Sequence, residues 1–453
     1  MNRTAPHALR AYLHLPVAIL GAGVSGRAAA EAIAAFGGDV VVYDRAGVEG
    51  ARTRFDSSVA RGHALAIASP GLETAHPWLE ATRAAGCEVW AELDLGAVAW
   101  PGKTIAVTGT NGKTTLTEFL AHALRSIGRD ARAVGNNGRA FSAEALIDAS
   151  SESIAVCEVS SFQAEQLRVL VPDVALWTNF AEDHLERHGT MESYFRAKYA
   201  LLARAPTGMR FHGPEVARFA TAHGIALEGS EEVDLASESI SRSELAGTVF
   251  AGRPQLENFL LARACWRALG CEDPALWAAA GSFVLGPHRL ARVAEIDGVV
   301  YWNDSKATNF HATEAALAAF DAPVLLVAGG KAKGGDVDSF ARRIAPRVRK
   351  AFLLGETSAV LARALQACGI DAVVFATLRE AVQTARLAAV RGDHVLLSPG
   401  FASFDMFKGY DDRGRQFEAV VATLAGSTHS AETSVSQSIK HSNRPARPGL
   451  CLT

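Results

Sequence analysis

The sequence has few of the features that disulfide-rich, exported or membrane-spanning proteins need. Its six cysteines form no C-x-x-C pair, which argues against a disulfide framework and against a cysteine zinc site. No segment reaches the ~18 consecutive apolar residues of a membrane span, and residues 1–16 contain no continuous apolar stretch of the kind that a signal peptide carries. We therefore expect a cytoplasmic protein with no membrane partner.

A charge excess is missing as well. The 45 Lys and Arg residues nearly balance the 48 Asp and Glu residues, which leaves a formal net charge of −3 over 453 residues. Without a broad basic field the chain is not expected to bind nucleic acid, and an anionic ligand must be held by local geometry. Hydrophobic residues make up 49% of the chain, which is enough for the cores of several domains.

Short apolar segments alternate along the chain with segments in which apolar residues recur at the spacing of a helix. This alternation predicts an α/β protein with mostly parallel, buried strands. The expected strands are Val17–Leu20, Val40–Tyr43, Ile105–Val107, Ile154–Cys157, Val174–Trp177, Val299–Trp302, Val324–Ala328, Ala351–Leu354 and Val395–Leu397. The segment after Lys113 repeats apolar residues at helical spacing and predicts a helix. The residues expected on its buried face are Leu116, Phe119, Leu120, Ala123, Leu124 and Ile127.

Two breaks divide the sequence into three expected domains. Trp100, Pro101 and Gly102 end a first α/β segment, and Gly286 with Pro287 precedes a new series of strands. We therefore expect domains over residues 1–100, 101–285 and 286–425. Residues 426–453 are polar, rich in serine and without apolar period, so they are expected to form a disordered tail.

A glycine-rich loop follows the expected strand at Ile105–Val107. It consists of Gly109, Thr110, Asn111, Gly112, Lys113, Thr114 and Thr115. Backbone N–H groups at a helix start attract phosphate, the Lys113 amine can reach the β- and γ-phosphates, and the Thr114 hydroxyl can ligate Mg²⁺. The loop departs from the general G-x-x-x-x-G-K-[ST] pattern, because position 107 is Val. An ordinary glycine-rich turn is the alternative, but it leaves Lys113 and Thr114 unexplained.

Two further strand ends carry polar side chains. Glu158 ends an expected strand, where a phosphate-loop enzyme needs a carboxylate for Mg²⁺, although a carboxylate there can simply be solvated. His184 and His188 follow the next strand at a helical spacing that could suit zinc. However, Glu186 is misplaced for H-E-x-x-H and no third ligand is obvious, so a zinc site is not expected.

A second glycine motif lies near the N-terminus. Gly21–Gly26 follows the first expected strand and Asp44 ends the second, as in a dinucleotide-binding fold. Taken alone, this motif favours an NAD-dependent oxidoreductase, which is the alternative from another class of enzyme. That alternative leaves the loop at 109–115 and Glu158 without a role.

Taken together, the motifs resemble the Mur ligases, a family of ATP-dependent enzymes that form amide bonds in peptidoglycan precursor synthesis. The resemblance spans about residues 17 to 420. Its motifs in this chain are Thr108–Thr114, Gly135–Gly138, Glu158–Gln163, Asp183–His184, Tyr194–Lys198, Gly286–Arg289, Asn303–Asn309 and Leu397–Ser403. Within the family, Asn303–Asn309 and Ala68–Gly71 are similar to the member that adds D-glutamate.

The resemblance implies a fold and an activity. The fold would be α/β with three domains: a Rossmann-like domain for the UDP-linked substrate, a central P-loop ATPase-like domain, and a C-terminal Rossmann-like domain for the amino acid. The enzyme would join D-glutamate to UDP-N-acetylmuramoyl-L-alanine through an acyl phosphate, using ATP and two Mg²⁺ ions. We expect a monomer with no nucleic-acid partner.

The same resemblance implies roles for individual residues. Lys113, Glu158, His184 and Lys198 would be catalytic, and Thr114, Glu158, His184 and Lys198 would ligate metal. Lys198 would carry a carbamate, which forms on a neutral amine and therefore needs a lowered lysine pKa.

The remaining implied contacts are with nucleotides and substrates. ATP would contact the loop at 109–115 together with Asn258, Arg289, Asp304 and Lys306. The uridine nucleotide would contact Ser25, Asp44, Arg45 and Ser69. Further substrate contacts would come from Asn136, Ser160, Thr308, Lys333, Ser403 and Tyr410, of which the last four would hold D-glutamate.

The chain departs from the family at several positions, among them Glu186 in place of Asp and Ala291 in place of Glu, and most clearly in one motif. Where the family has His-Asn-x-x-Asn near the adenine, this chain has Pro254-Gln255-Leu256-Glu257-Asn258 and keeps only the last Asn. We therefore expect a looser preference for ATP over GTP, with Asn258 providing the selectivity that remains. A non-catalytic relative is the alternative, but the presence of all the implied lysines and acids favours an active ligase.

Overall fold

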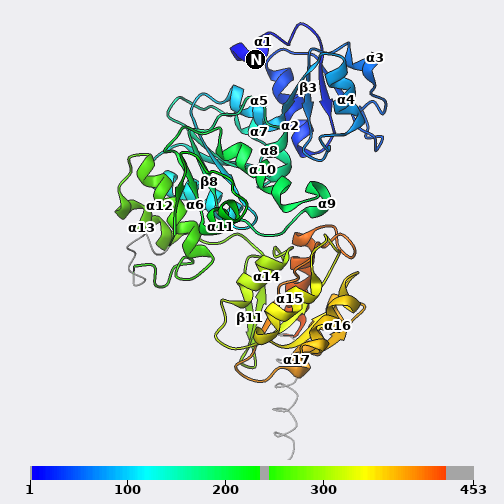
Figure 1. Ribbon diagram of the computed structural model, residues 1–453, viewed down its shortest axis with the longest axis vertical. Coiled ribbons are helices and arrows are strands. Elements are labelled where there is room, and N and C mark those ends of the chain that lie inside the picture. The colour runs from blue at the N-terminus through cyan, green and yellow to red at the C-terminus, as the bar shows by residue number, and fades with distance from the viewer. Residues whose placement is uncertain (1–2, 235–243, 425–453) are drawn as a thin grey trace, which may run out of the picture. The chain divides into compact units, whose positions relative to one another are not determined.

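The computed structural model describes residues 3–234 and 244–424, so the expected tail at 426–453 lies outside the described residues. The chain forms two compact units, Met1–Val284 and Leu285–Thr453. The first unit contains two sheets and the second unit contains one (Figure 1). The division of the first unit into residues 1–100 and 101–285 stays a prediction, although each part has its own sheet.

The N-terminal sheet has four parallel strands in the order β2-β1-β3-β4. They are β1 Val17–Leu20, β2 Val40–Tyr43, β3 Leu65–Ala68 and β4 Glu88–Ala91. Alternate residues of β1 pack on opposite faces, Ala18 with Trp78 and Ile19 with Ile33, so both faces of the sheet are covered. The helices of this part are α1 His7–Arg10, α2 Val24–Ala35, α3 Ser57–Ala60, α4 Pro77–Ala84 and α5 Glu92–Ala99.

The central sheet has six parallel strands in the order β10-β9-β8-β5-β7-β6. They are β5 Lys103–Thr108, β6 Ala131–Gly135, β7 Ile154–Glu158, β8 Val174–Trp177, β9 Arg210–His212 and β10 Glu231–Glu232. The helices are α6 Lys113–Ser126, α7 Phe141–Glu144, α8 Ser161–Gln166, α9 Leu185–His188, α10 Met191–Leu202, α11 Pro214–Ala222, α12 Gln255–Ala268 and α13 Asp273–Ser282. Because β5, β7 and β8 are parallel neighbours, the residues that follow them meet at one edge of the sheet.

A buried aspartate connects the two sheets of the first unit. Asp94, in the first turn of α5, has no exposed surface. Its carboxylate accepts hydrogen bonds of 2.8–3.2 Å from the backbone N–H groups of Ala91, Arg168, Val169 and Leu170. Hydrogen bonds to a charged group contribute about 1.5–3 kcal/mol each, so this carboxylate fixes the end of β4 against the loop that follows α8.

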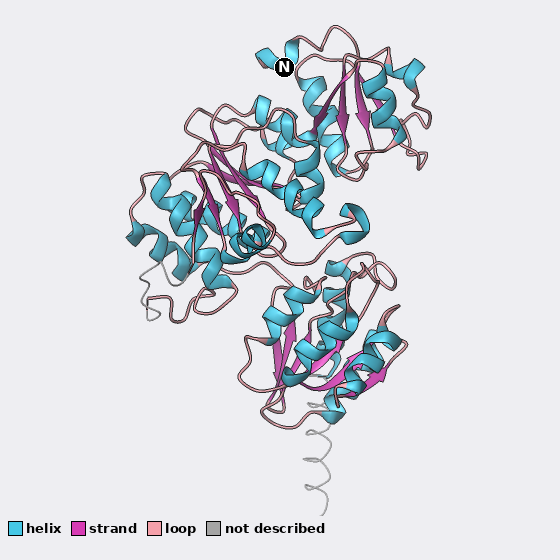
Figure 2. Cartoon of the chain, in the orientation of Figure 1, coloured by secondary structure: helices cyan, strands magenta, loops and turns pink. Residues whose placement is uncertain are grey.

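The C-terminal sheet has six strands in the order β11-β12-β16-β13-β14-β15, of which only β11 is antiparallel. Figure 2 shows strands (magenta) and helices (cyan) together in this unit. They are β11 Ala291–Ile296, β12 Val299–Asn303, β13 Val324–Ala328, β14 Val348–Leu353, β15 Asp371–Val374 and β16 His394–Leu397. The helical segments are α14 Phe310–Leu317, α15 Val337–Ile344, the 3₁₀ turn Ala345–Arg347, α16 Ser358–Ala367, α17 Leu378–Ala388 and residues 410–424.

The structure confirms the expected fold class, since all three sheets are α/β and mostly parallel. Two local expectations were wrong. The strand expected at Ala351–Leu354 begins at Val348 and ends before Leu354, because Arg349 and Lys350 conceal the apolar period at its start. Ile127 is not on the buried helix face: α6 ends at Ser126, and Ile127 is 39% exposed as its C-cap. Among the described residues, no helix has the length and apolar character that crossing a membrane requires.

Candidate active site

The glycine-rich loop at the end of β5 has a backbone that only glycine fits. Gly109 and Gly112 have φ angles of 147° and 81°. A Cβ on Gly109 would lie 1.8 Å from Oγ1 of Thr178, and one on Gly112 would lie 2.6 Å from Oδ1 of Asn258. Gly112 is also the N-cap of α6, so the loop leads directly to the helix start, where backbone N–H groups attract phosphate.

Hydrogen bonds hold this loop against the segment that follows β8. The backbone N–H groups of Thr110 and Asn111 donate to the backbone and side-chain oxygens of Asn179 at 3.0 and 2.9 Å. The Thr110 hydroxyl lies 3.1 Å from the backbone N of Ala181 and 3.3 Å from the Tyr194 hydroxyl. The loop is therefore shaped before any phosphate binds.

Two lysine amines meet at one carbonyl of the loop. Nζ of Lys113 donates to the carbonyls of Gly109 and Thr110 at 2.9 and 2.8 Å. Nζ of Lys198, which comes from α10, donates to the same Gly109 carbonyl at 2.6 Å. Of the neighbouring threonines, Thr115 is buried in α6 and Thr114 is half-buried.

Lys198 is buried in a way that favours its neutral amine. Only 1% of the residue is exposed. Burial lowers the Lys198 pKa well below its usual range, and the nearby charge of Lys113 lowers it further, against the opposing effect of Asp183 and Glu158. A lysine that loses its proton this easily meets the chemical condition for carbamate formation.

The two carboxylate oxygens of Glu158, the last residue of β7, have different surroundings. Oε1 accepts a hydrogen bond of 2.9 Å from Nδ2 of Asn136. The other oxygen, Oε2, is buried and has no hydrogen-bond partner among the described residues. Ser160, two residues later, is the N-cap of α8, where its hydroxyl forms a capping box with Gln163. An unpaired buried carboxylate oxygen is costly, and a divalent cation would satisfy it.

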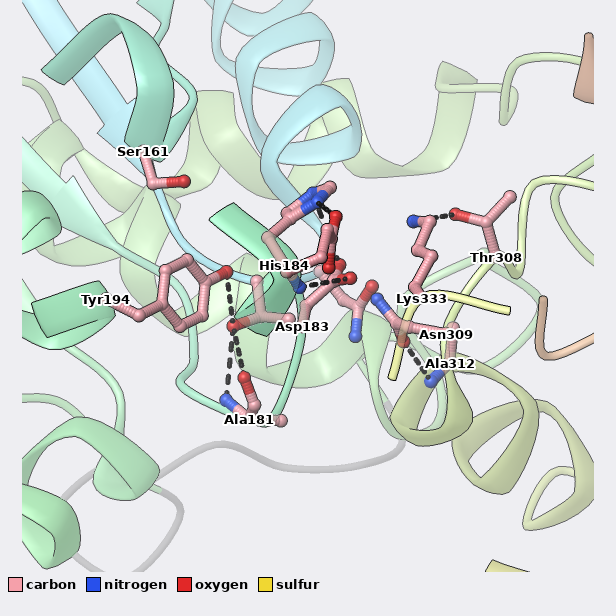
Figure 3. Close-up of polar contacts among 12 residues, drawn as sticks. Ser161, Ala181, Asp183, His184, Tyr194, Thr308, Asn309, Ala312 and Lys333 are labelled. Atoms are coloured by element: carbon pink, nitrogen blue, oxygen red, sulfur yellow. Dashed lines mark hydrogen bonds and ion pairs between the residues drawn. The ribbon is translucent and has the colours of Figure 1, made fainter. Parts of the chain in front are cut away.

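His184 lies at the start of α9 in an unusual conformation. Its φ angle is 54°, a left-handed value that needs support from its surroundings. Nδ1 lies 3.3 Å from the Glu186 carboxylate and Nε2 lies 3.6 Å from Asp183, as Figure 3 shows for Asp183 and His184. No three His, Cys, Asp or Glu side chains in residues 3–234 and 244–424 group into a metal site. A metal here would therefore also need oxygen ligands such as the Thr114 hydroxyl or a phosphate.

The glycine motif near the N-terminus, Gly21–Gly26, also forms a defined loop. The Asp44 carboxylate accepts a hydrogen bond of 2.7 Å from the backbone N–H of Ala22. This bond and a second one from Ala46 lower the Asp44 pKa. A Cβ on Gly21 would lie 2.7 Å from the Cβ of Ser69, so the structure brings Asp44 and Ser69 to the same loop. The other two expected uridine contacts, Ser25 and Arg45, lie in the first turn of α2 and directly after Asp44.

In the second unit, Asp304 directly follows β12 and is almost fully buried. Its carboxylate accepts hydrogen bonds from the Leu290 backbone at 3.1 Å and from the Ser398 hydroxyl at 2.8 Å. Burial raises the Asp304 pKa to about 7, even though these two hydrogen bonds and the charges of Arg289 and Arg413 oppose the shift. Arg289 and Asp304, both expected ATP contacts, are thus close enough to interact.

Asp304→Asn should change how stability depends on pH. Because the folded-state pKa is raised from 3.8 to about 7, the stability that the protonated carboxyl contributes is fully present below ~pH 4 and is lost as the pH rises through ~7. The difference in unfolding free energy between wild type and variant should therefore shift against the wild type by on the order of 4 kcal/mol from about pH 4 to about pH 8. Denaturant unfolding at several pH values measures this. The exposed Asp338→Asn is the control, and a difference that stays constant with pH would contradict the assignment.

The expected glutamate contacts of the second unit fall into neighbouring groups. Nζ of Lys333 donates a long hydrogen bond of 3.5 Å to Oγ1 of Thr308 (Figure 3). Nζ of Lys306 lies 3.7 Å from the centre of the Tyr410 ring. An antiparallel bridge between Lys331 and Ala402 joins the two loops that carry Lys333 and the buried Ser403.

Sequence reasoning missed Arg413, a buried arginine that shapes this region. It is 1% exposed and donates to the backbone and hydroxyl oxygens of Ser305 at 2.9 and 3.0 Å and to the Phe401 carbonyl at 3.2 Å. Burial lowers its pKa to about 10, against the charges of Asp405 and Asp304. The sequence did carry a sign of this burial, because Arg413 lies at helical spacing from Phe417, which is buried.

The altered segment, Pro254–Asn258, forms the N-cap and first turn of α12 and places Asn258 beside the phosphate loop. Asn258 is 3% exposed, and its Nδ2 donates to Oε1 of Gln255 at 2.8 Å. Gln255 therefore orients the one Asn that this motif retains. The expected contact of Asn258 with adenine, and the looser ATP preference, stay predictions.

Two protein-family models match the chain. The model described as the Mur ligase middle domain matches residues 107–212, and the one described as the Mur ligase, glutamate ligase domain matches residues 288–401. The first match covers the phosphate loop, Glu158, His184 and Lys198. The second covers Asp304, Thr308 and Lys333.

Curated relatives extend the similarity to nearly the whole chain. The UDP-N-acetylmuramoylalanine–D-glutamate ligase of Gloeobacter violaceus is 36% identical over 90% of this chain and 99% of its own. The enzyme of the same name from Pelotomaculum thermopropionicum is 34% identical over 92% and 99%.

Solved structures show a similar fold at low identity. The UDP-N-acetylmuramate–alanine ligase of Thermotoga maritima aligns with a TM-score of 0.57 at 15% identity, over 90% of this chain and all of its own. MurF of Acinetobacter baumannii aligns with a TM-score of 0.57 at 18% identity, over 82% of this chain and 93% of its own.

Proposed function

This chain belongs to the Mur ligase family, and we propose that it joins D-glutamate to UDP-N-acetylmuramoyl-L-alanine while converting ATP to ADP and phosphate. The observation that carries the proposal is the meeting of Lys113 and Lys198 at the Gly109 carbonyl of the phosphate loop. It occurs in a chain that matches curated D-glutamate ligases almost from end to end. We further propose that the enzyme acts as a monomer in the cytoplasm.

The reaction first requires two anions to meet. An oxygen of the L-alanyl carboxylate attacks the γ-phosphorus of ATP, the bond to ADP breaks, and an acyl phosphate forms. Lys113 would turn its amine from the loop carbonyls to the phosphate oxygens, and the N-terminus of α6 would add its N–H groups. The amine of D-glutamate then attacks the acyl carbon, phosphate leaves, and the amine gives up a proton as the amide forms.

The residues at the sheet edge fit Mg²⁺ and a carbamate. The unpaired buried Oε2 of Glu158 would hold a cation together with the Thr114 hydroxyl, and His184 and a carbamate on Lys198 would hold a second one. The bound cations would neutralise the charge that develops on the transferred phosphate. The lowered pKa of Lys198 supports the carbamate, because only the neutral amine can form it.

The other expected residues would bind the uridine nucleotide, the region near the reacting carboxylate, ATP and D-glutamate. Ser25, Asp44, Arg45 and Ser69 would seat the uridine nucleotide without redox chemistry. Asn136 and Ser160 would contact the substrate near the reacting carboxylate. In the second unit, Arg289, Asp304 and Lys306 would contact ATP, and Thr308, Lys333, Ser403 and Tyr410 would hold D-glutamate.

Phosphate release with single components omitted tests this function. Release should require ATP, Mg²⁺ and UDP-N-acetylmuramoyl-L-alanine, and sustained turnover should also require D-glutamate. Added NAD should have no effect. Turnover that depends on NAD, or tight NAD binding with no response to the UDP-linked substrate, would favour the oxidoreductase interpretation of Gly21–Gly26 instead. A folded protein without any turnover would favour the non-catalytic relative.

A further inference from the structure

The short helix α9 touches two parts of the proposed site within the first unit. His184, the residue before it, has the left-handed φ angle of 54°, which its surroundings must hold. Near its other end, Arg187 donates a hydrogen bond of 3.2 Å to the Leu72 carbonyl. Leu72 belongs to the loop after β3 that also carries Ser69, and its backbone N–H donates to the Ser69 carbonyl at 3.0 Å. A shift of α9 would therefore move both His184 and this loop.

Glu165 on α8 contacts two consecutive residues of α9. Its carboxylate lies 3.0 Å from Nδ1 of His188 and 3.6 Å from the guanidinium of Arg187. Nε2 of His188 lies 2.9 Å from the hydroxyl of Ser161 at the start of α8, and the His188 side chain has no exposed surface. Burial would raise the Glu165 pKa, but the contacts with His188 and Arg187 outweigh it and lower the pKa. Glu165 is therefore an anion at neutral pH, held between two partners on α9.

Two other side chains of α8 support the same arrangement. The Phe162 ring lies under the Arg187 guanidinium at 4.7 Å, and its centre is 4.8 Å from the ring of His184. Nε2 of Gln166 donates to the Leu72 carbonyl at 2.6 Å, so that one carbonyl accepts from both helices. The loop at 69–72, α8 and α9 form one connected cluster.

We propose that Glu165 is a positioning residue for the ligase reaction, which fixes α9 through His188 and Arg187 so that His184 and the loop at 69–72 keep a set spacing. The inference rests on the proposed function, because this spacing matters when the uridine end of the substrate binds near Ser69 and its carboxylate reacts near His184. Small misplacements of a reacting group cost up to ~100-fold in rate. The phosphate loop is held directly by Asn179 of the segment after β8 and reaches this cluster only indirectly through Tyr194, whose ring centre lies 4.9 Å from that of His188, so ADP binding should change less than binding of the UDP-linked substrate.

The test compares Glu165→Ala, Glu165→Gln and Arg187→Ala in the full chain. The controls are Glu192→Gln and Arg196→Ala, which alter an exposed ion pair on the neighbouring α10. Calorimetry gives Kd for UDP-N-acetylmuramoyl-L-alanine and separately for ADP, and the phosphate assay gives kcat. We expect Glu165→Ala to raise Kd for the UDP-linked substrate ~10-fold and to lower kcat ~30-fold, with Kd for ADP within ~2-fold of wild type. Glu165→Gln should lie between, since it keeps the length of the side chain but loses the charge that faces His188 and Arg187.

The outcomes separate positioning from general stability. Arg187→Ala should weaken binding of the UDP-linked substrate in the same way, and its effect should not add to that of Glu165→Ala, because the residues share one network. Equal weakening of ADP and substrate binding, or control-like values in folded variants, would overturn the proposal. If Glu165→Ala does not fold, Arg187→Ala decides by the same criterion. A wild-type protein that shows no turnover would instead reject the proposed function.

Discussion

Replacing Lys113 by Ala should lower kcat by about three orders of magnitude, the size expected when a phosphate-charge stabiliser is lost. The Lys113 amine donates to the Gly109 and Thr110 carbonyls at 2.9 and 2.8 Å, within the loop at the start of α6 where a phosphate would bind. The loop itself should keep its shape, because glycine geometry and the bonds to Asn179 define it. Phosphate release measures kcat, and circular dichroism checks folding.

Lys103→Ala is the matched control for this substitution. Lys103 begins the same strand, β5, at the end away from the loop, and it is exposed. We expect it to leave kcat within ~2-fold of wild type, as surface changes usually do. An active Lys113→Ala enzyme with an unchanged ATP requirement would show that the loop is only structural.

Lys198→Ala should be nearly inactive and should regain part of its activity when small carboxylates such as formate or acetate are added. The reason is the environment of the amine, which is 1% exposed and has a strongly lowered pKa. Such an amine can take up carbon dioxide and present an anionic oxygen to a metal ion. In the variant, the vacated space can admit a carboxylate that supplies a similar oxygen. Phosphate release with a titration of each carboxylate measures the rescue.

Lys113→Ala is the control for that rescue. It removes a positive charge rather than a metal ligand, so added carboxylates should not restore its activity. Full activity of Lys198→Ala without any addition would reject the carbamate. Equal rescue of both variants would show that the carboxylates act elsewhere.

The phosphate loop was predictable from the sequence because its chemistry is local. A strand, two glycines and a lysine at a helix start are enough to place Lys113, and the structure has this order. Glu158 and Asp304 could also be placed at strand ends, each in its own sheet. In a parallel sheet the residues that follow the strands lie at one edge, where ligands bind.

Residues whose environment is built from distant segments were harder to predict. Lys198 lies four residues after Tyr194 and three before Leu201, both buried, so a lysine within an apolar stripe was a usable signal of burial. The spacing gave no partner for it, however, since Gly109 is 89 residues away in the chain. The same holds for Glu165, whose contact with Arg187 and His188 depends on how α9 folds back onto α8. The Asp304 pKa is likewise set by distant segments: burial raises it, and the hydrogen bond from Ser398, which is 94 residues away, opposes that shift.

The central claim is that this chain forms an acyl phosphate on the L-alanyl carboxylate and then transfers the acyl group to D-glutamate. Isotope transfer tests it most directly. UDP-N-acetylmuramoyl-L-alanine labelled with ¹⁸O in that carboxylate is incubated with ATP, Mg²⁺ and D-glutamate, and mass spectrometry follows phosphate and product. The account predicts one ¹⁸O atom in each phosphate released, together with a product that has gained one D-glutamate. The same incubation with L-glutamate in place of D-glutamate should give little product. Unlabelled phosphate, or phosphate release without the glutamate-containing product, would contradict it.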